Sequence, residues 1–297
     1  DYAISTHKSE QSADSVFTRA SGYKNLSRFD VDGTDFFESH LAFKQASERA
    51  RKGEGPSVVV TNVVRLLPHS SSDDQRKYRT EEDLFKDQER DPILILKSQC
   101  IKSKFISQKD FEKLDDSAKE QVELDVVWSE KQPYPDEKTA LDHVYSSDLF
   151  TNEVSFNSIS ENVVMVDAIN HALSEEMSRN EKMLIFGQDI ADPKGGVFTA
   201  TKGLSDDYGS NRVFNSPLAE SSIVGTAVGL AVAGYKPVVE IQFGDYIWTA
   251  MNQIRNEVVT MRYRSNNSWT CPLIIRAPVG GYIHGGLCHS QSIDGYF

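Results

Sequence analysis

Cysteine and long hydrophobic runs are scarce in this sequence. The three cysteines, Cys100, Cys271 and Cys288, are far apart and form no CxxC pair. An odd number of scattered cysteines argues against a disulfide framework, and a reducing cytoplasm is the simplest compartment. No apolar run approaches the roughly 18 residues that a membrane-spanning helix needs. We therefore expect a cytoplasmic protein with no membrane partner.

Positive charge is also in short supply. The chain has 32 Lys and Arg against 44 Asp and Glu, which gives a formal net charge of -12 at pH 7. Proteins that bind nucleic acids carry basic patches for the phosphates, so we expect no nucleic-acid partner. An acidic enzyme, or a component of an assembly, fits this composition better.

Both ends of the sequence lack the usual boundary signals. The first residues, DYAIST, contain neither an initiator Met nor the basic segment of a signal peptide. The last residues, DGYF, carry no signal that ends a domain. Both ends are therefore expected to be cuts through a longer protein.

Strand and helix patterns alternate along the chain. Its 297 residues, 39% of them hydrophobic, predict about two domains with substantial cores. Such alternation predicts an α/β fold in which parallel sheets are covered by helices on both faces. Helices are expected near 37–46, 111–126, 164–173, 220–232 and 251–263, and strands at 57–66 (buried), 182–187, 237–243 and 272–277.

The pattern dissolves between the two halves. Pro133, Pro135 and several turn-forming residues interrupt it. The sequence therefore predicts a first domain at 1–130, a linker at 131–161 and a second domain at 162–297.

A polar loop follows the first expected strand. It carries guanidinium groups, an imidazole and several hydroxyls, among them Arg65, His69, Ser70 and Arg79. Sites in α/β sheets gather at the carboxyl ends of strands, and arginine binds phosphate through two hydrogen bonds. The loop thus suits an anion, although composition alone favours an ordinary solvated loop.

A glutamate opens the helix expected at 220–232. Glu220 stands in NSPLAESSIVG, just before a run of small residues. A carboxylate at this place complements the helix dipole and satisfies free N–H groups. Taken alone, Glu220 therefore has a purely structural explanation.

Three side chains near the C-terminal end are of types that bind metals. His284, Cys288 and His289 follow the strand expected at 272–277. Their spacing fits no common zinc signature, and there is no second ligand pair. A glycine-rich loop with a core or surface histidine is the more frequent arrangement.

Two long segments resemble the two subunits of one enzyme family. GPSVVVTNVVRLLPHSSSDDQRKYRTEEDL resembles the end of the alpha subunit of branched-chain 2-oxo acid dehydrogenases. The segment that runs from FGQDIADPKGG through NSPLAESSIVG to QIRNE resembles their beta subunit. The resemblance implies two thiamine-diphosphate-binding-type domains in a fused alpha–beta chain, both incomplete. The first corresponds to the C-terminal part of the diphosphate-binding domain, and the second to the N-terminal part of the aminopyrimidine-binding domain.

The resemblance also assigns residues of the first domain. His69 is expected to contact the cofactor diphosphate and the substrate, with Arg65 supporting it and Ser70 in the same cofactor-binding loop. Ser70 matches a regulatory phosphoserine of mammalian relatives, a regulation that is not expected here. Only the backbone carbonyl of Tyr2 remains as a matching ligand for Mg2+. Because magnesium requires near-octahedral oxygen ligation, this stretch alone is expected to hold it poorly and to be inactive.

Residues of the second domain are assigned in the same way. Glu220 is expected to hydrogen-bond the aminopyrimidine ring of thiamine diphosphate, and a buried Glu can share a proton in this way. His289, in the HSQS step, is expected to act as acid and base in the substrate and lipoyl steps. Gln188 replaces the Glu usual in the GED step, which puts a proton-sharing link there in doubt. Leu218, Gln242 and Tyr246 are expected to line the pocket, and the carbonyls of PLIIRAP to bind K+.

The implied activity is the oxidative decarboxylation of a branched-chain 2-oxo acid of the 3-methyl-2-oxobutanoate type. The acyl group then passes to a lipoyl group of the acyltransferase component, and a homodimer of fused chains is implied. YR after HSSSDD, and EIQF-x-DYI at 240–247, favour the branched-chain type. The alternatives are a pyruvate or acetoin dehydrogenase of the same architecture, or a non-catalytic truncated chain that serves assembly or folding.

Overall fold

The computed structural model describes residues 2–146 and 162–297. The chain divides into two compact units, Asp1–Pro133 and Tyr134–Phe297. Of the linker expected at 131–161, residues 147–161 lie outside the described part of the chain. Its described part includes a short 3-10 helix, η3 (Glu137–Leu141).

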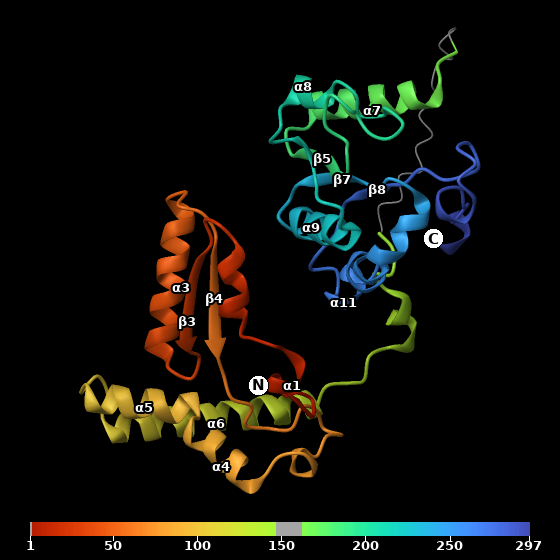
Figure 1. Ribbon diagram of the computed structural model, residues 1–297. Helices are drawn as coiled ribbons and strands as arrows, with labels where there is room; N and C mark the ends of the chain where they lie inside the picture. Colours follow the sequence, from red (N-terminus) through yellow and green to blue (C-terminus); the bar gives the residue numbers. More distant parts are fainter. Residues whose placement is uncertain (1, 147–161) are drawn as a thin grey trace. The chain divides into compact units, whose positions relative to one another are not determined.

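The first unit contains a βαβ arrangement. β3 (Ser27–Asp32) and β4 (Ser57–Asn62) form a parallel pair, and α3 (Phe36–Arg51) packs against both strands (Figure 1). The Asp35 side chain begins α3 by accepting hydrogen bonds from two backbone N–H groups of its first turn. Gly53 follows the helix in the left-handed region, with φ of 72°. The helix expected near 37–46 is therefore confirmed.

The strand expected at 57–66 is shorter and less buried than predicted. β4 ends at Asn62, and the side chains of its first five residues are only half-buried. The physical reason is that a two-stranded sheet, packed mainly against α3 and the short α2 (Val16–Arg19), buries less of each strand than a larger sheet.

Three helices follow β4 in the first unit: α4 (Glu81–Glu89), α5 (Pro92–Lys102) and α6 (Gln108–Glu130). A capping box of Ser107 and Asp110 begins α6. The apolar stripe expected at 111–126 does lie on this helix, but most of it is exposed within its unit. The shorter elements of the unit are β1 (Tyr2–Ala3), β2 (Thr6–His7), α1 (Lys8–Gln11), η1 (Ala20–Gly22) and η2 (Gln75–Lys77).

The second unit is built on a four-stranded sheet in the order β6-β5-β7-β8. Every neighbouring pair in it is parallel, which confirms the predicted α/β class. The strands are β5 (Met183–Gly187), β6 (Val213–Asn215), β7 (Lys236–Glu240) and β8 (Ile274–Arg276).

Helices and apolar side chains cover both faces of this sheet. On one face, α9 (Glu220–Val232) joins a buried cluster that includes Phe186 and Val239. The opposite face carries a second cluster with Ile185 and Val238, to which α7 (Met165–Arg179) contributes Met177. Side chains alternate along a strand, so neighbours such as Ile185 and Phe186 serve different clusters. A short helix, α8 (Leu204–Tyr208), lies beside α7 (Figure 1).

Two expectations for this unit need correction. The single helix predicted at 251–263 is broken into α10 (Met251–Gln253), a π-helical turn η5 (Ile254–Val258) and α11 (Met261–Arg264). The strands predicted at 237–243 and 272–277 are shorter, because pairing ends at Glu240 and spans only three residues in β8. Across the two described ranges, no helix has the length and apolar character to cross a bilayer.

Candidate functional site

The carboxyl edge of the second unit's sheet gathers the polar side chains of its site. Gln188 directly follows β5, and Gln242 comes two residues after β7. Gln188 shares strand parity with Phe186, so it points to the face that α9 covers. Glu220 is the first residue of α9. Parallel strands thus bring residues distant in sequence to one edge, where α/β sheets carry their ligands.

Both carboxylate oxygens of Glu220 contact a polar group. The Gln188 amide donates from Nε2 to Oε1 over 3.1 Å. The hydroxyl of Thr249, in η4 (Gly244–Ala250), donates to Oε2 over 3.1 Å. The first turn of a helix has a partial positive charge, which complements an acidic side chain at this position. The carboxylate is therefore held from both sides and remains only half-buried.

Gln188 is one of the most enclosed polar residues of the unit. Its residue exposure is 2%, and its Oε1 atom has no hydrogen-bond partner among the described residues. A buried acceptor without a donor costs about 1–3 kcal/mol. The amide therefore donates one hydrogen bond to Glu220, while its buried oxygen has no donor among the described residues.

An aromatic cluster stands beside this pair. Tyr246 in η4 contacts His289 through its hydroxyl, with 2.6 Å between Oη and Nε2. The Phe243 ring meets both rings edge-on, at centroid distances of 5.6 Å and 4.8 Å. Gly285 fits closely under the histidine, since a Cβ there would lie 2.4 Å from the His289 Cβ. The imidazole is thus fixed by a hydrogen bond and by ring packing.

The remaining predicted residues of this unit take different positions. Gln242 donates from Nε2 to Asp189 Oδ2 over 2.9 Å, so it is engaged with Asp189. Leu218 is 82% exposed. Thr249 connects Glu220 to Tyr246. Its hydroxyl lies 3.1 Å from Glu220 Oε2 and 3.1 Å from the Tyr246 carbonyl. Thr249 was not expected from the sequence, because nothing in its local spacing marks it.

A buried ion pair on the opposite face of the sheet was also not predicted from the sequence. Glu240, at the end of β7, has 2% side-chain exposure and binds Arg276 of β8 through Nε at 3.1 Å and through a second guanidinium nitrogen. The two residues are direct cross-strand partners. Glu240 Oε1 has no partner among the described residues.

One aspartate, Asp192, stabilises the loop after β5 by hydrogen bonds. Asp192 accepts from the Gly203 N–H at 2.8 Å and from the Ser205 hydroxyl at 2.7 Å. Burial raises the pKa of Asp192, but hydrogen bonds from Gly203, Ser205 and Asp206 outweigh it, so the pKa lies below its ordinary value. The ionised carboxylate thus stabilises the loop that begins at Gln188.

In the first unit, the predicted anion-binding residues form an internal network. Arg65 donates to the Ile4 carbonyl at 2.8 Å and to the Tyr78 hydroxyl at 2.6 Å. Tyr78 donates to Asp73 at 2.6 Å, and the His69 backbone N–H donates to the same carboxylate oxygen at 2.9 Å. These two bonds lower the pKa of Asp73, while burial and then the Asp73 bond raise the pKa of Tyr78.

This network brings some predicted residues together and leaves others apart. The Tyr2 ring lies under the Arg65 guanidinium, 5.5 Å from ring centre to carbon. His69 joins only through its backbone, and the Ser70 hydroxyl contacts that of Ser72 at 3.1 Å. Both His69 and Ser70 are exposed. Terminal nitrogens of Arg65 thus already serve protein acceptors.

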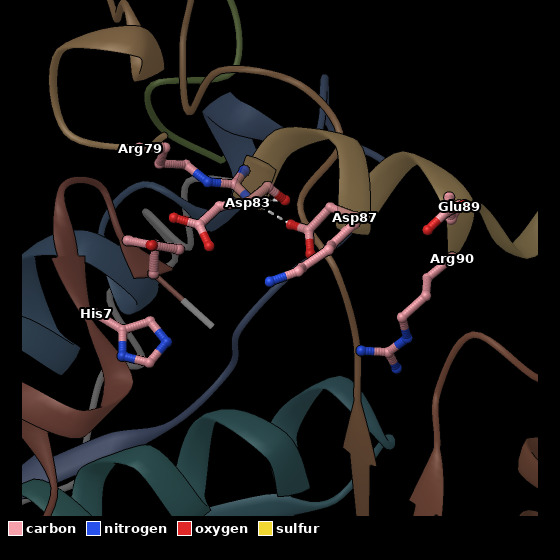
Figure 2. A pocket seen from close by; sticks show the side chains of 8 residues that line it. His7, Arg79, Asp83, Asp87, Glu89 and Arg90 are labelled. Carbon is pink, nitrogen blue, oxygen red and sulfur yellow. Dashed lines mark hydrogen bonds and ion pairs between the residues drawn. The ribbon is translucent and has the colours of Figure 1, made fainter. Parts of the chain in front are cut away.

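A cavity of about 440 Å³ opens next to this network, within the first unit. Figure 2 shows Arg79 directed toward Asp87, with His7 on another side of the space. Arg79 is almost fully buried, and its guanidinium lies 5.0 Å from the Tyr2 ring centre. Cations and carboxylates balance around the cavity, so it offers an anion no excess of positive charge. Its lining residues are Tyr2, His7, Arg79, Asp83, Lys86, Asp87, Glu89 and Arg90.

Metal ligands do not converge in either unit. Within residues 2–146 and 162–297, no three His, Cys, Asp or Glu side chains gather as a metal ion requires. Tyr2 lies in β1, where its residue pairs with His7, and a single carbonyl does not satisfy magnesium. The described residues therefore do not fit Mg2+ by themselves, and we assign no step to it.

Comparison with known proteins assigns each half of the chain separately. Residues 1–138 match the family "Dehydrogenase E1 component", and residues 161–297 match "Transketolase, pyrimidine binding domain". The beta subunit of 2-oxoisovalerate dehydrogenase from Bacillus subtilis (strain 168) is 50% identical over 132 residues, which cover 44% of this chain and 40% of that one. The E1 component beta subunit of pyruvate dehydrogenase from the same organism is 44% identical, over 45% and 41%.

A solved structure named "Split gene transketolase, inactive beta4 tetramer" is 25% identical to this chain, with a TM-score of 0.31 over 43% of this chain and 36% of the other. The chain spans about 40% of the length of the curated relatives it matches. The sequence matches together support one class of protein, the E1 component of a thiamine-diphosphate-dependent 2-oxo acid dehydrogenase. Thiamine diphosphate is the cofactor that this class implies.

Proposed function

We propose that this chain takes part in the oxidative decarboxylation of a branched-chain 2-oxo acid of the 3-methyl-2-oxobutanoate type. The acyl group is passed to a lipoyl group of an acyltransferase component, and the working unit is a dimer of fused alpha–beta chains. The observation that carries the proposal is the Glu220 carboxylate, held at the start of α9 by Gln188 and Thr249. The higher identity to a 2-oxoisovalerate enzyme supports the substrate class.

The residues of the second unit fit the aminopyrimidine part of thiamine diphosphate. Such a ring has an apolar face and polar edges, and this edge of the sheet offers both kinds of surface. Glu220 would hold the ring nitrogen, and the open acceptor of Gln188 stands in the same polar group. Phe243 and Tyr246 supply aromatic surface nearby. When bound, the cofactor supplies the electron sink that decarboxylation of a 2-oxo acid requires.

The chain's own groups then have defined tasks. Glu220 holds and releases a proton at its carboxylate, and His289 exchanges a proton with the substrate or lipoyl group through an imidazole that Tyr246 orients. Leu218 and Gln242 stay proposed lining residues. In the first unit, His69, Arg65 and Ser70 are proposed for the diphosphate. In the free protein Arg65 donates to the Ile4 carbonyl and the Tyr78 hydroxyl, and the diphosphate would compete with these two acceptors.

Three further expectations stay predictions. The first is an Mg2+ site with the Tyr2 carbonyl as one ligand, for which the described residues gather no set of metal-binding side chains. K+ at the carbonyls of 272–278 and the cytoplasmic location rest on sequence patterns alone.

Activity of the full-length protein tests the proposal. With thiamine diphosphate and Mg2+ supplied, it should decarboxylate 3-methyl-2-oxobutanoate faster than pyruvate. Glu220→Gln should lower kcat by about a hundredfold or more, because the amide cannot take up the proton. Glu175→Gln is the matched control, since Glu175 is exposed on α7 and pairs only loosely with Arg179 at 3.7 Å. Absence of turnover with every 2-oxo acid tested would sink the enzyme proposal.

Pyruvate or acetoin is the second candidate substrate class, favoured by the 44% identity to a pyruvate dehydrogenase subunit. A ratio of kcat/KM above one for pyruvate over 3-methyl-2-oxobutanoate would select it. A protein that neither binds thiamine diphosphate nor turns over would instead support the non-catalytic alternative.

A further inference from the structure

The two oxygens of Glu220 have chemically different neighbours. Oε1 faces the Nε2 group of Gln188, and an amide N–H donates hydrogen bonds but accepts none. Oε2 faces the Thr249 hydroxyl, which donates one hydrogen and also accepts. A proton on Oε1 would therefore point at the hydrogens of the amide. A proton on Oε2 has an acceptor ready.

The Thr249 hydroxyl has two acceptors for its single hydrogen. Its Oγ1 lies 3.1 Å from Glu220 Oε2 and 3.1 Å from the Tyr246 carbonyl. When Glu220 is ionised, the hydrogen can point to Oε2. When Oε2 carries a proton, Glu220 can donate to Oγ1, and the hydroxyl can turn its hydrogen to the carbonyl. Both protonation states thus keep a complete set of hydrogen bonds.

The orientation of the Gln188 amide is part of this arrangement. Turning the amide over would place its oxygen against Glu220 Oε1, which is favourable only if that oxygen carries the proton. An unprotonated carboxylate oxygen only accepts hydrogen bonds, so the amide nitrogen is the better neighbour for Oε1. Burial of Gln188 to 2% exposure prevents water from taking its place.

Charged groups on neighbouring elements do not pair with Glu220 in the described part of the chain. Among the described residues, none besides Gln188 and Thr249 has a hydrogen bond or ion pair with Glu220, and α9 carries no second titratable residue. Arg255 and Glu257 of η5 are exposed. The remaining groups that adjacent elements bring are Asp189, Glu240, Asp245, Tyr246 and His289, of which Glu240 is paired with Arg276 on the opposite face.

We propose that Gln188 and Thr249 are positioning residues that confine the proton of Glu220 to Oε2. This inference rests on the proposed function for its meaning in cofactor activation, while its physical basis belongs to the cofactor-free protein. Gln188 acts as a neutral donor that keeps Oε1 an acceptor. Thr249 acts as the reversible partner of Oε2.

Gln188→Glu tests the role of the neutral amide. It sets two carboxyl groups at hydrogen-bond distance, and such a pair shares one proton that it holds to a higher pH than a free carboxyl does. When a group binds its proton more tightly in the folded state, the protein loses stability as pH rises through the folded pKa of that group. Thermal unfolding of the cofactor-free, full-length protein should therefore match wild type at pH 5. At pH 8 the variant should melt about 5–10 °C lower.

The uncharged variant Gln188→Met is the matched control. It removes the donor without adding a charge, so its melting temperature should differ from wild type by a constant amount between pH 5 and pH 8. A Gln188→Glu protein whose melting temperature follows wild type over the whole range would overturn the proposal. A variant that is unfolded even at pH 5 would overturn it equally, because a protonated carboxyl has the shape and donor of the amide.

Thr249→Val and Thr249→Ser test the other oxygen. Both variants keep the backbone carbonyl that the Ser221 hydroxyl binds, but only Ser retains the hydroxyl. Calorimetric titration with thiamine diphosphate at pH 7 should show about tenfold weaker binding for Thr249→Val, and binding within about twofold of wild type for Thr249→Ser. Equal binding by the two variants would refute the role of Thr249. If wild type itself fails to bind thiamine diphosphate, the proposed function falls, while the unfolding test of Gln188 still decides its own question.

Discussion

Replacing Arg276 by methionine should destabilise the second unit strongly, because it strands the buried carboxylate of Glu240. The side chains of the pair are 20% and 2% exposed, and one N–O distance is 3.1 Å. At an effective dielectric constant of about 20, two charges at this distance attract by about 5 kcal/mol. The methionine variant loses that attraction and leaves a carboxylate whose Oε1 already has no partner in the described part of the chain.

Breaking a buried pair from one side costs about 3–5 kcal/mol. In a unit of this size that corresponds to a fall in melting temperature on the order of 10 °C. Differential scanning calorimetry of wild type, Arg276→Met, Glu240→Leu and the double variant measures the effect and the coupling. The double variant should recover most of the loss, because two apolar side chains of similar volume replace the pair.

Lower pH should shrink the defect of Arg276→Met, since protonation removes the stranded charge. Lys202→Met, at an exposed position of the same unit, controls for the loss of a positive charge alone. An Arg276→Met protein within about 1 kcal/mol of wild type would refute the reasoning, since it would mean that water or another cation compensates Glu240.

Two further predictions concern the loop after β5 and the aromatic cluster. Asp192→Asn should lower the melting temperature by about 3–6 °C at pH 7 through weaker loop hydrogen bonds. The folded pKa of Asp192 is lowered, so its contribution to stability is present above the unfolded pKa of about 3.9 and is lost as pH falls through the folded pKa. A melting-temperature deficit of Asp192→Asn that persists undiminished at pH 2 would contradict this. So would an equal deficit in the control Asp207→Asn, which changes an exposed carboxylate. Tyr246→Phe should lower kcat about tenfold and move the pH profile of kcat, because His289 loses its 2.6 Å partner. Tyr263→Phe, at an exposed position, should leave both unchanged, and a Tyr246→Phe profile identical to wild type would exclude the role of that hydrogen bond.

Periodicity predicted the elements whose apolar pattern is unambiguous. α3 and α9 lie where helical spacing placed them, and the run at 182–187 became β5. β3 was not predicted, because its sequence SRFDVD carries two carboxylates and reads as a strand only when paired with β4. The helix expected at 251–263 breaks at η5, since the same apolar spacing accommodates an α-helix or a π-turn and packing decides between them.

The candidate site was predicted unevenly for a related reason. Motif resemblance pointed to Glu220 and His289 and to the exchange at Gln188. It did not show that Gln188 touches Glu220, a contact between residues 32 positions apart, nor that Thr249 holds the other oxygen. Such contacts depend on how strands and helices meet at the sheet edge. They follow from the fold and not from local spacing.

Arg65 illustrates a limit of composition-based reasoning. The guanidinium of an arginine in a loop after a strand can bind an anionic ligand or acceptors of the protein itself, and the sequence is compatible with both. The structure shows the internal choice, with the Ile4 carbonyl and the Tyr78 hydroxyl as partners. Residue types alone do not rank these competitors, because the ranking depends on which acceptors the folded chain brings within reach.

The internal hydrogen bonds of Arg65 also compete with any anion that binds this loop. An anion that displaces the Ile4 carbonyl or the Tyr78 hydroxyl from Arg65 binds only the molecules in which that partner has been released, so its apparent Kd equals the intrinsic Kd divided by the released fraction. If about one molecule in a hundred is released, affinity falls about a hundredfold. A substitution such as Tyr78→Phe, which removes an acceptor of Arg65, then tightens anion binding without touching the anion. Affinity in this loop is therefore governed as much by what the free protein gives up as by what the bound protein gains.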